Sequence, residues 1–335
     1  MFEIVFLGTS ASAPSIRRGL ASQVVLYRQY RFMIDCGEGT QRQLLKSGLG
    51  FKRLDKILLT HGHLDHILGL AGLLSTFMRW ETIEKMEVYG GKATLDRVYD
   101  LLFKVVLRGA KPPMPLRLIE VRPSSVMQDQ HFELTAFPVT HRGASGCLGF
   151  MFREKPRRPF LDDRAESLGV PRGPERKQLV AGQSIALPNG RVIHPDDVLG
   201  PVEQGASLAV VGDAGRTDDL IESVRDVDAL VIEATYLQQE AEMAVQYGHL
   251  TATQAALLAQ QAGAKQLILT HVSRRYHEKD ILAEAQAMFP ATVVARDFDR
   301  YRVLRDKTML ILPDQVAAPE SPGAAGSEEE SNVGS

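Results

Sequence analysis

The segment His61-Gly62-His63-Leu64-Asp65-His66 places three imidazoles and one carboxylate within six residues. It directly follows Lys56–Thr60, a short apolar run of branched residues that predicts a buried strand. Histidine nitrogens and aspartate oxygens bind zinc well at about 2.0–2.2 Å, and a turn with a glycine can direct alternate side chains to one centre. The segment therefore predicts a divalent metal site. The alternative is a solvated, histidine-rich turn.

Further candidate ligands stand where other predicted strands end. His141, Asp213 and His271 each follow a short apolar run. Polar groups at strand ends gather on one rim of a rigid scaffold, where α/β proteins build their sites. Three other histidines lack this context and are expected at the surface: His131, His194 and His277.

Short β-rich runs alternate with helical patterns, which indicates one α/β domain. The early strands follow one another without helices between them, and this favours a partly antiparallel arrangement of two sheets. Strands are expected at Glu3–Leu7, Ser22–Tyr27, Tyr30–Asp35, Lys56–Thr60, Met86–Tyr89, Phe132–Phe137, Gly149–Phe152, Leu208–Val211, Ala229–Ile232 and Gln266–Leu269. Helices are expected at Thr40–Ser47, Asp65–Trp80, Lys92–Val106, Thr251–Ala262 and Asp280–Phe289.

The composition limits the classes of protein to consider. The 335 residues are 44% hydrophobic and 24% charged, which is typical of a globular protein with a sizeable core. The net charge of −2 excludes a broadly basic nucleic-acid binder, so contact with RNA or DNA needs a local patch or a metal site. Two cysteines exclude a disulfide framework and fit a reducing cytosol. No signal peptide or membrane-spanning run is found, so a cytoplasmic protein is expected.

Two segments depart from the α/β pattern. Residues 153–177 hold four prolines and eight Lys/Arg against five Asp/Glu. A solvated loop is the common fate of such a stretch, but a long excursion from a compact domain is more often functional. The tail from Val316 is of low complexity and is expected to be disordered. We therefore expect one α/β domain over 1–313, with a segment inserted over about 153–182, and a disordered tail over 314–335.

Together these residues resemble the metallo-β-lactamase superfamily, whose signature is His-x-His-x-Asp-His followed by a His, an Asp and a His at later strand ends. The resemblance implies an αββα sandwich of two mixed sheets with helices on the outer faces. The implied ligands of one zinc ion are His61, His63 and His141. Those of the second are Asp65, His66 and His271, and Asp213 bridges the two ions. Asp35 matches an early aspartate that orients a ligand.

Within the superfamily, the chain resembles ribonuclease Z from Phe6 to about Asp299. The matching motifs are Asp35–Gln41 (DCGEGTQ), Glu233–Thr235 (the end of HEAT), Gly248–Thr251 (the His-Ser-Thr segment) and Thr270–Tyr276 (the final ligand motif). The resemblance implies an endoribonuclease that removes the 3′ trailer of precursor tRNA, leaving a 3′-hydroxyl on the tRNA and a 5′-phosphate on the trailer. It also implies a homodimer with two Zn²⁺ per subunit, or another divalent metal such as Mn²⁺.

The resemblance implies catalytic roles for three residues. Asp65 is the expected acceptor of a proton from the attacking water. The leaving ribose 3′ oxygen needs a proton, for which His249 is the expected donor and Glu233 the carboxylate that orients it. The alternative for His249 is a surface histidine at the start of a helix.

Residues 153–177 fall where this family carries a protruding arm that grips the tRNA elbow, with one subunit's arm serving the other's active site. Gly173-Pro174 matches the Gly-Pro element of that arm. Arg157, Arg158 and Arg176 suit phosphate recognition through their planar guanidinium groups.

Three positions depart from the family's pattern. Ile232 replaces the histidine of HEAT. Asp213-Ala214-Gly215-Arg216 stands where the family commonly has Asp-Thr-Arg. Gly19 follows Arg18 where a loop motif of the family often ends Arg-Asn. We expect Arg18 to contact substrate, and the departures to affect substrate positioning rather than metal binding. Two other functions stay open: a small-molecule phosphodiester or thioester hydrolase, which needs no arm, and an inactive RNA-binding relative, which needs no complete ligand set.

Overall fold

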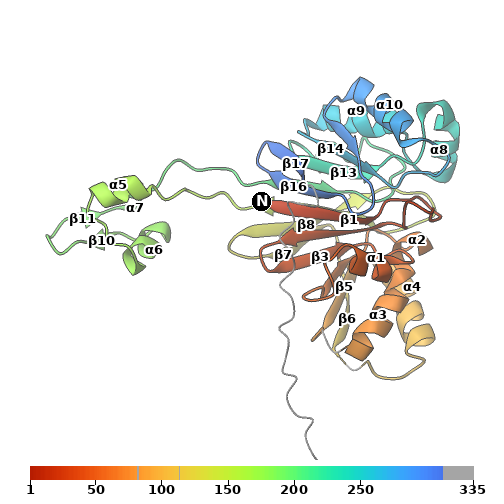
Figure 1. The fold of residues 1–335 in the computed structure, drawn as a ribbon, viewed down its shortest axis with the longest axis horizontal. Coiled ribbons are helices and arrows are strands. Elements are labelled where there is room, and N and C mark those ends of the chain that lie inside the picture. The colour runs from red at the N-terminus through yellow and green to blue at the C-terminus, as the bar shows by residue number, and fades with distance from the viewer. Residues whose placement is uncertain (81–82, 113, 312–335) are drawn as a thin grey trace, which may run out of the picture.

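The structure is a computed structural model that describes residues 1–80, 83–112 and 114–311, so the predicted tail over 314–335 lies outside the described residues. Two β-sheets pack face to face, and helices cover their outer faces (Figure 1). The predicted αββα sandwich of two mixed sheets is confirmed. No helix in the described part of the chain is long and apolar enough to cross a membrane.

Within the described residues, the first sheet has eight strands in the order β17-β16-β1-β2-β3-β4-β5-β6. They are β1 (Phe2–Gly8), β2 (Ser22–Tyr27), β3 (Tyr30–Ile34), β4 (Lys56–Leu58), β5 (Met86–Gly90), β6 (Leu116–Glu120), β16 (Arg300–Leu304) and β17 (Lys307–Ile311). Strands β3 to β6 pair in parallel, and the other neighbours are antiparallel.

The second sheet has seven described strands in the order β15-β14-β13-β12-β9-β8-β7. They are β7 (Ser124–Gln128), β8 (Phe132–Val139), β9 (Cys147–Glu154), β12 (Ser207–Val210), β13 (Ala229–Glu233), β14 (Leu267–Thr270) and β15 (Thr292–Val294). Strands β12 to β15 are parallel, whereas β7, β8, β9 and β12 alternate in direction.

Alternation along β1 shows why the layers form. Phe2, Ile4 and Phe6 face the core between the two sheets, whereas Val5 and Leu7 face the helices. Because successive side chains of a strand point to opposite faces, a strand that is apolar on both faces must be covered on both. Burying each large apolar side chain contributes about 1.5–3 kcal/mol, so the core between the sheets and the core under each layer of helices hold the sheets in place.

The helices lie in two layers. Those on the first sheet are α1 (Thr40–Lys46), α2 (Leu64–Ile67), α3 (Gly69–Trp80), α4 (Lys92–Tyr99) and the π-helix η1 (Asp100–Val106). Those on the second are the 3₁₀-helix η2 (Gln238–Glu240), α8 (Ala241–Tyr247), α9 (Ala252–Ala262) and α10 (Glu278–Met288). The single helix predicted over Asp65–Trp80 is wrong. It divides at Leu68, because the Gly69 amide donates to the Cys36 carbonyl (2.8 Å).

The segment between β9 and β12 folds as a separate small unit that projects from the sandwich (Figure 1). It contains α5 (Asp162–Ser167), α6 (Pro174–Val180), β10 (Ile185–Ala186), β11 (Val192–Ile193) and α7 (Pro195–Val198). Its own core is formed by Ala165, Val170, Leu179, Ile185, Leu187, Ile193 and Val198. The unit therefore continues beyond residue 182, where the sequence placed its end, because β11 and α7 complete that core.

Two chain segments join this unit to the sandwich, and they extend the β9–β12 ladder. Arg157 pairs with Glu203, and Phe160 pairs with Leu199. Nearer the sandwich, the Glu154 amide donates to the Ala206 carbonyl (2.9 Å). We call residues 155–204 the arm and residues 160–199 its head. The arm leaves the sandwich as a paired ribbon rather than as two free linkers.

Candidate metal centre

The strand ends bring the predicted ligands together at one edge of the sandwich. His61 follows β4, whereas His141, Asp213 and His271 follow β8, β12 and β14, three strands that run in the same direction. The two sheets meet here closely. A Cβ atom on Gly212 would lie 2.6 Å from the Thr60 hydroxyl oxygen, so only glycine allows this approach.

A first group of ligand atoms surrounds one point. His61 Nε2 lies 2.9 Å from His63 Nδ1 and 3.6 Å from Asp213 Oδ2. His141 Nε2 lies 3.2 Å from His63 Nδ1 and 3.9 Å from the same Asp213 oxygen. Ligands held at about 2.0–2.2 Å from a tetrahedral ion lie about 3.3–3.6 Å apart, so this group has the size of a metal site.

A second group lies on the other side of Asp213. His66 Nε2 lies 3.4 Å from Asp213 Oδ1 and 3.8 Å from Asp65 Oδ2. His271 Nε2 lies 3.4 Å from the same Asp65 oxygen. Asp213 therefore turns one carboxylate oxygen to each group. The arrangement suits a pair of divalent ions that share one carboxylate.

The outer nitrogens of His141 and His66 are already bonded, which leaves their inner nitrogens as electron-pair donors. His141 Nδ1 donates to the Gly248 carbonyl (2.7 Å), and His66 Nδ1 donates to Asp35 Oδ2 (2.7 Å). In the described residues, His66 Nε2 and Asp213 Oδ1 are buried without a hydrogen-bond partner. Buried polar atoms seldom stay unpaired, and a metal ion would satisfy both. The residues present fit a divalent metal.

Asp35 fixes the geometry from behind. Its Oδ1 accepts a hydrogen bond from the Thr60 amide (2.8 Å), and its Oδ2 accepts one from the Thr60 hydroxyl (2.7 Å) besides that from His66. Asp35 (φ 57°) and His271 (φ 52°) both adopt the left-handed backbone region. Residues other than glycine adopt this region only uncommonly, and here the surrounding hydrogen bonds hold the two residues in it.

The charges in the site follow from burial and from close neighbours. Burial and the adjacent His66 lower the pKa of His61 well below its usual range, so this imidazole is neutral, as a ligand must be. Burial disfavours the ionised form of Asp213, but the surrounding histidines outweigh burial and hold its pKa well below the usual range. Asp65 behaves in the same way, with His271 and His66 lowering its pKa.

His249 lies beside the two groups and contacts a buried carboxylate. Its Nδ1 lies 3.0 Å from Glu233 Oε1 and 3.9 Å from Asp213 Oδ2. Glu233 Oε1 also accepts a hydrogen bond from the Ala214 amide (2.7 Å), and the Thr235 hydroxyl donates to the other oxygen. Burial opposes the charge on His249, but the Glu233 carboxylate outweighs burial and raises the pKa of His249 to about 9. At neutral pH this imidazole therefore carries a proton that it can donate.

Two protein-family models and several known proteins are similar to this chain. Residues 2–159 match the family model of the anti-Pycsar protein Apyc1, and residues 180–272 match that of the beta-lactamase superfamily domain. Ribonuclease Z of Bradyrhizobium sp. (strain ORS 278) is 47% identical over 303 residues, which cover 90% of this chain and 100% of that protein. The chain belongs to the ribonuclease Z family. It is accordingly a metal-dependent endoribonuclease.

A second relative and two solved structures are also similar to this chain. Ribonuclease BN of Erwinia tasmaniensis is 40% identical over 300 residues, 88% of this chain and 97% of that protein. The structure of human tRNase Z, short form, covers 90% of this chain and 99% of its own at a TM-score of 0.60 and 24% identity. The metallo-beta-lactamase fold protein YhfI from Bacillus subtilis covers 90% and 100% at a TM-score of 0.64 and 15% identity. These likenesses show the metallo-β-lactamase fold.

The departures from the ribonuclease Z pattern have local explanations. Ile232 is fully buried in the core between the second sheet and its helices, where a histidine would need a partner. Gly215 donates to the Thr140 carbonyl (2.7 Å), and a Cβ atom there would lie 3.3 Å from the Gly248 carbonyl oxygen. The Gly19 amide donates to Asp297 Oδ2 (2.6 Å). None of these positions displaces a candidate ligand.

Three arginines predicted to contact substrate use their donors within the protein. Arg18 donates to Thr9, to the Ala295 carbonyl and to Glu278, and its side chain is 14% exposed. Arg158 donates to Asp196 and to the carbonyls of Leu199 and Gly200. Arg176 pairs with Asp162 and lies over the Phe160 ring. Arg157 is exposed.

The other predicted positions are also placed. Gly173 (φ 144°) precedes α6 and Pro174 is its first residue, so this element starts a helix in the arm, as proline commonly does. His131, His194 and His277 lie outside the two ligand groups. Sequence reasoning missed Ser12, whose amide donates to Asp65 Oδ2 (2.9 Å), and Thr60. The only feature of the sequence that could have indicated a role for Thr60 is its position next to His61.

Proposed function

We propose that this enzyme cuts the 3′ trailer from precursor tRNA, leaving a 3′-hydroxyl on the tRNA and a 5′-phosphate on the trailer, with two Zn²⁺ ions per subunit. One observation carries the proposal: two ligand groups share Asp213, and His249, held by the Glu233 carboxylate, lies beside them. Mn²⁺ is the alternative metal, since imidazole and carboxylate ligands also accept it. A pair of divalent ions supplies Lewis-acid chemistry, activating water and offsetting negative charge on the phosphate.

The residues divide the proton transfers between them. Asp65, held by the Ser12 amide and beside His271, accepts the proton of the attacking water. His249 donates a proton to the departing ribose 3′ oxygen, which is a poor leaving group without one. Glu233 keeps His249 oriented and charged, and its own burial leaves it no other charged partner among the described residues.

The position of the arm supports a homodimer. The arm begins where β9 ends and returns where β12 begins, whereas the ligands follow the other end of β12. The eight residues of β9 span about 26 Å, so the arm leaves the sandwich far from its own metal centre. The arm of one subunit is proposed to hold the tRNA body while the metal centre of a second subunit cuts its 3′ end. We place this enzyme in the cytoplasm, where precursor tRNA is available to it in a reducing compartment that suits two free cysteines.

Cleavage of a 3′-extended tRNA, with the new 3′ end mapped, tests the proposal. We expect a single cut at the start of the trailer and a 5′-phosphate on the product. Bis-p-nitrophenyl phosphate is the parallel substrate. Hydrolysis of this small diester without cleavage of the tRNA would replace the proposal with a small-molecule phosphodiesterase, and absence of both activities in metal-loaded protein would leave an inactive RNA-binding relative. Elemental analysis is expected to find two zinc ions per chain.

A further inference from the structure

The positive charge of the arm lies at its root and not on its head. The root, taken as residues 153–158 at the end of β9 and the start of the arm, holds four Lys/Arg and one Glu, whereas the head over 160–199 holds five Lys/Arg and six Asp/Glu. Within the head, Arg172 pairs with Glu166, and Arg176 pairs with Asp162. A net negative head cannot attract an RNA backbone through its overall charge.

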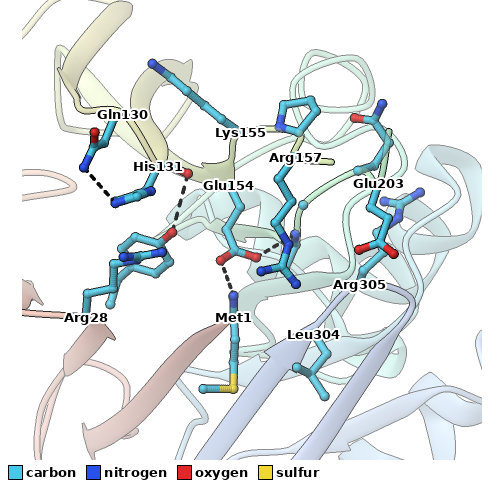
Figure 2. Close-up of a pocket in the computed structure, with 15 residues that line it drawn as sticks. Met1, Arg28, Gln130, His131, Glu154, Lys155, Arg157, Glu203, Leu304 and Arg305 are labelled. Carbon is cyan, nitrogen blue, oxygen red and sulfur yellow. Dashed lines mark hydrogen bonds and ion pairs between the residues drawn. The ribbon is translucent and has the colours of Figure 1, made fainter. Parts of the chain in front are cut away.

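An open pocket of about 650 Å³ lies at this root (Figure 2). Both ribbon segments of the arm line it, together with the β2–β3, β7–β8 and β16–β17 turns. The His131 carbonyl ties three of these segments together, because it accepts from the Lys155 amide (2.8 Å) and from the Tyr27 hydroxyl (3.4 Å). The pocket is therefore a fixed feature of the fold.

Three exposed cations of this pocket are free of carboxylates. No carboxylate oxygen in the described part of the chain lies within 4.0 Å of the side-chain nitrogens of Arg28, Lys155 or Arg157. Of the two carboxylates present, Glu154 accepts a hydrogen bond from the Ala206 amide (3.1 Å), and Figure 2 shows it turned to the Met1 nitrogen. Three free cations and one free carboxylate, Glu203, thus line the pocket.

We propose that the pocket at the arm root binds phosphates of the RNA backbone through Arg28, Lys155 and Arg157. This inference rests on the proposed function. In it, the root of the arm supplies the salt-sensitive electrostatic attraction to the RNA backbone, and the head contacts the RNA through the complementary shape of its surface. Phosphate is the ligand chemistry because free guanidinium and ammonium groups on an open, polar surface bind it directly.

Two matched triple variants test this within the arm. The root variant carries R28Q, K155Q and R157Q, and the head variant carries R164Q, K177Q and R191Q, three exposed cations without an ion pair among the described residues. Dissociation constants for 3′-extended tRNA are measured at several salt concentrations in chelator, so that no cleavage occurs. We expect the root variant to bind more weakly and to lower the slope of log K against log salt by about one for each lost contact.

The head variant is expected to keep the wild-type slope. A lower slope in the head variant with an unchanged root variant would overturn the proposal, and so would unchanged slopes in both. Hydrolysis of bis-p-nitrophenyl phosphate at the wild-type rate shows that each variant is folded. Failure of the proposed function is a separate result, because it appears as wild-type protein that binds the tRNA without cutting it when metal is restored.

Discussion

Asp65 and His249 are proposed to take part in different proton transfers, and one substitution at each residue distinguishes the two roles. Asp65→Ala removes a candidate ligand as well as the acceptor, so we expect it to abolish cleavage of both precursor tRNA and bis-p-nitrophenyl phosphate. His249→Ala is expected to lower kcat on the tRNA by about 10²–10⁴-fold and to affect the small diester far less. Nitrophenolate leaves without a proton, whereas a ribose alkoxide needs one. Equal losses on the two substrates would remove His249 from the donor role.

Asp35 acts through His66 and Thr60, so its substitution should change metal binding more than folding. Asp35→Asn keeps the size of the side chain but weakens its hydrogen bond from His66 Nδ1. We expect an affinity for zinc about 10–100-fold lower, measured by competition with a chelator of known strength. Ser207→Ala, which removes a buried hydroxyl that donates to Asp228 (2.9 Å) at the end of β12 away from the ligands, is the control for a general loss of stability. Unchanged zinc affinity in Asp35→Asn would contradict this role.

At the scale of single residues, the sequence predicted which side chains meet but not what holds them. His141, Asp213 and His271 could be selected because each follows a strand, and parallel strands end at a common edge. The contacts behind them come from groups without a sequence pattern, such as the Ser12 amide and the Gly248 carbonyl. Backbone groups are present at every position, so only the folded chain shows which of them point into the site.

The arm can be removed without breaking the sandwich, because the ladder already pairs Glu154 with Ala206 at its base. Replacing residues 156–204 by Asn-Gly would close a two-residue hairpin between Lys155 and Gly205. We expect this variant to raise KM for precursor tRNA and to leave turnover of bis-p-nitrophenyl phosphate nearly unchanged. Steady-state kinetics on both substrates checks it. A parallel loss on both would mean that the arm supports the fold.

The β1–β16 pair carries an ion cluster with a defined pH dependence. Glu3 contacts Arg300 and Arg302 across the strands. Burial alone would raise the pKa of Glu3, but hydrogen bonds and charges from the two arginines outweigh it and lower the pKa. A lowered pKa stabilises the fold at pH above the unfolded value of about 4.3, and this stabilisation is lost as the pH falls through the folded value.

Glu3→Gln should therefore lower the free energy of unfolding by about 1–3 kcal/mol at pH 7, and by progressively less below about pH 4. Urea unfolding of the variant and the wild type at pH 7 and at pH 3 measures the difference in the free energy of unfolding. A difference that stays constant between pH 7 and pH 3 would show that the loss comes from packing and not from the charge.

At the scale of elements, periodicity predicted most strands of the two sheets to within two residues. It failed where one type of helix passes into another and where the elements are very short. The pattern over Lys92–Val106 is helical throughout, yet the chain passes from α4 into a π-helix at Asp100, and both share one apolar face. Periodicity predicted no helix or strand inside the arm, because its strands have two residues each and its helices are short. Its core forms from residues that are scattered along the sequence, which no local window detects.

For the whole molecule, the proposed homodimer, in which one subunit's arm serves the other's metal centre, predicts that two different defects can complement each other. A subunit without its arm keeps its metal centre, and an Asp65→Ala subunit keeps its arm. We expect a mixture of the two, refolded or co-expressed, to cut precursor tRNA at a low substrate concentration faster than either protein does alone. Mixing each defective protein with more of itself is the control. No recovery in a verified mixed dimer would mean that the arm serves its own subunit.

The attachment of the arm by a paired ribbon also bears on how such enzymes diversify. The insertion point lies at the end of the β9–β12 ladder away from the ligands, and the head has a core of its own. A gene segment that encodes such a head can therefore be gained, lost or exchanged at one place without disturbing a single candidate ligand. Substrate range and chemistry are then inherited separately, so two lineages can share one reaction centre while they differ in the nucleic acid that they select.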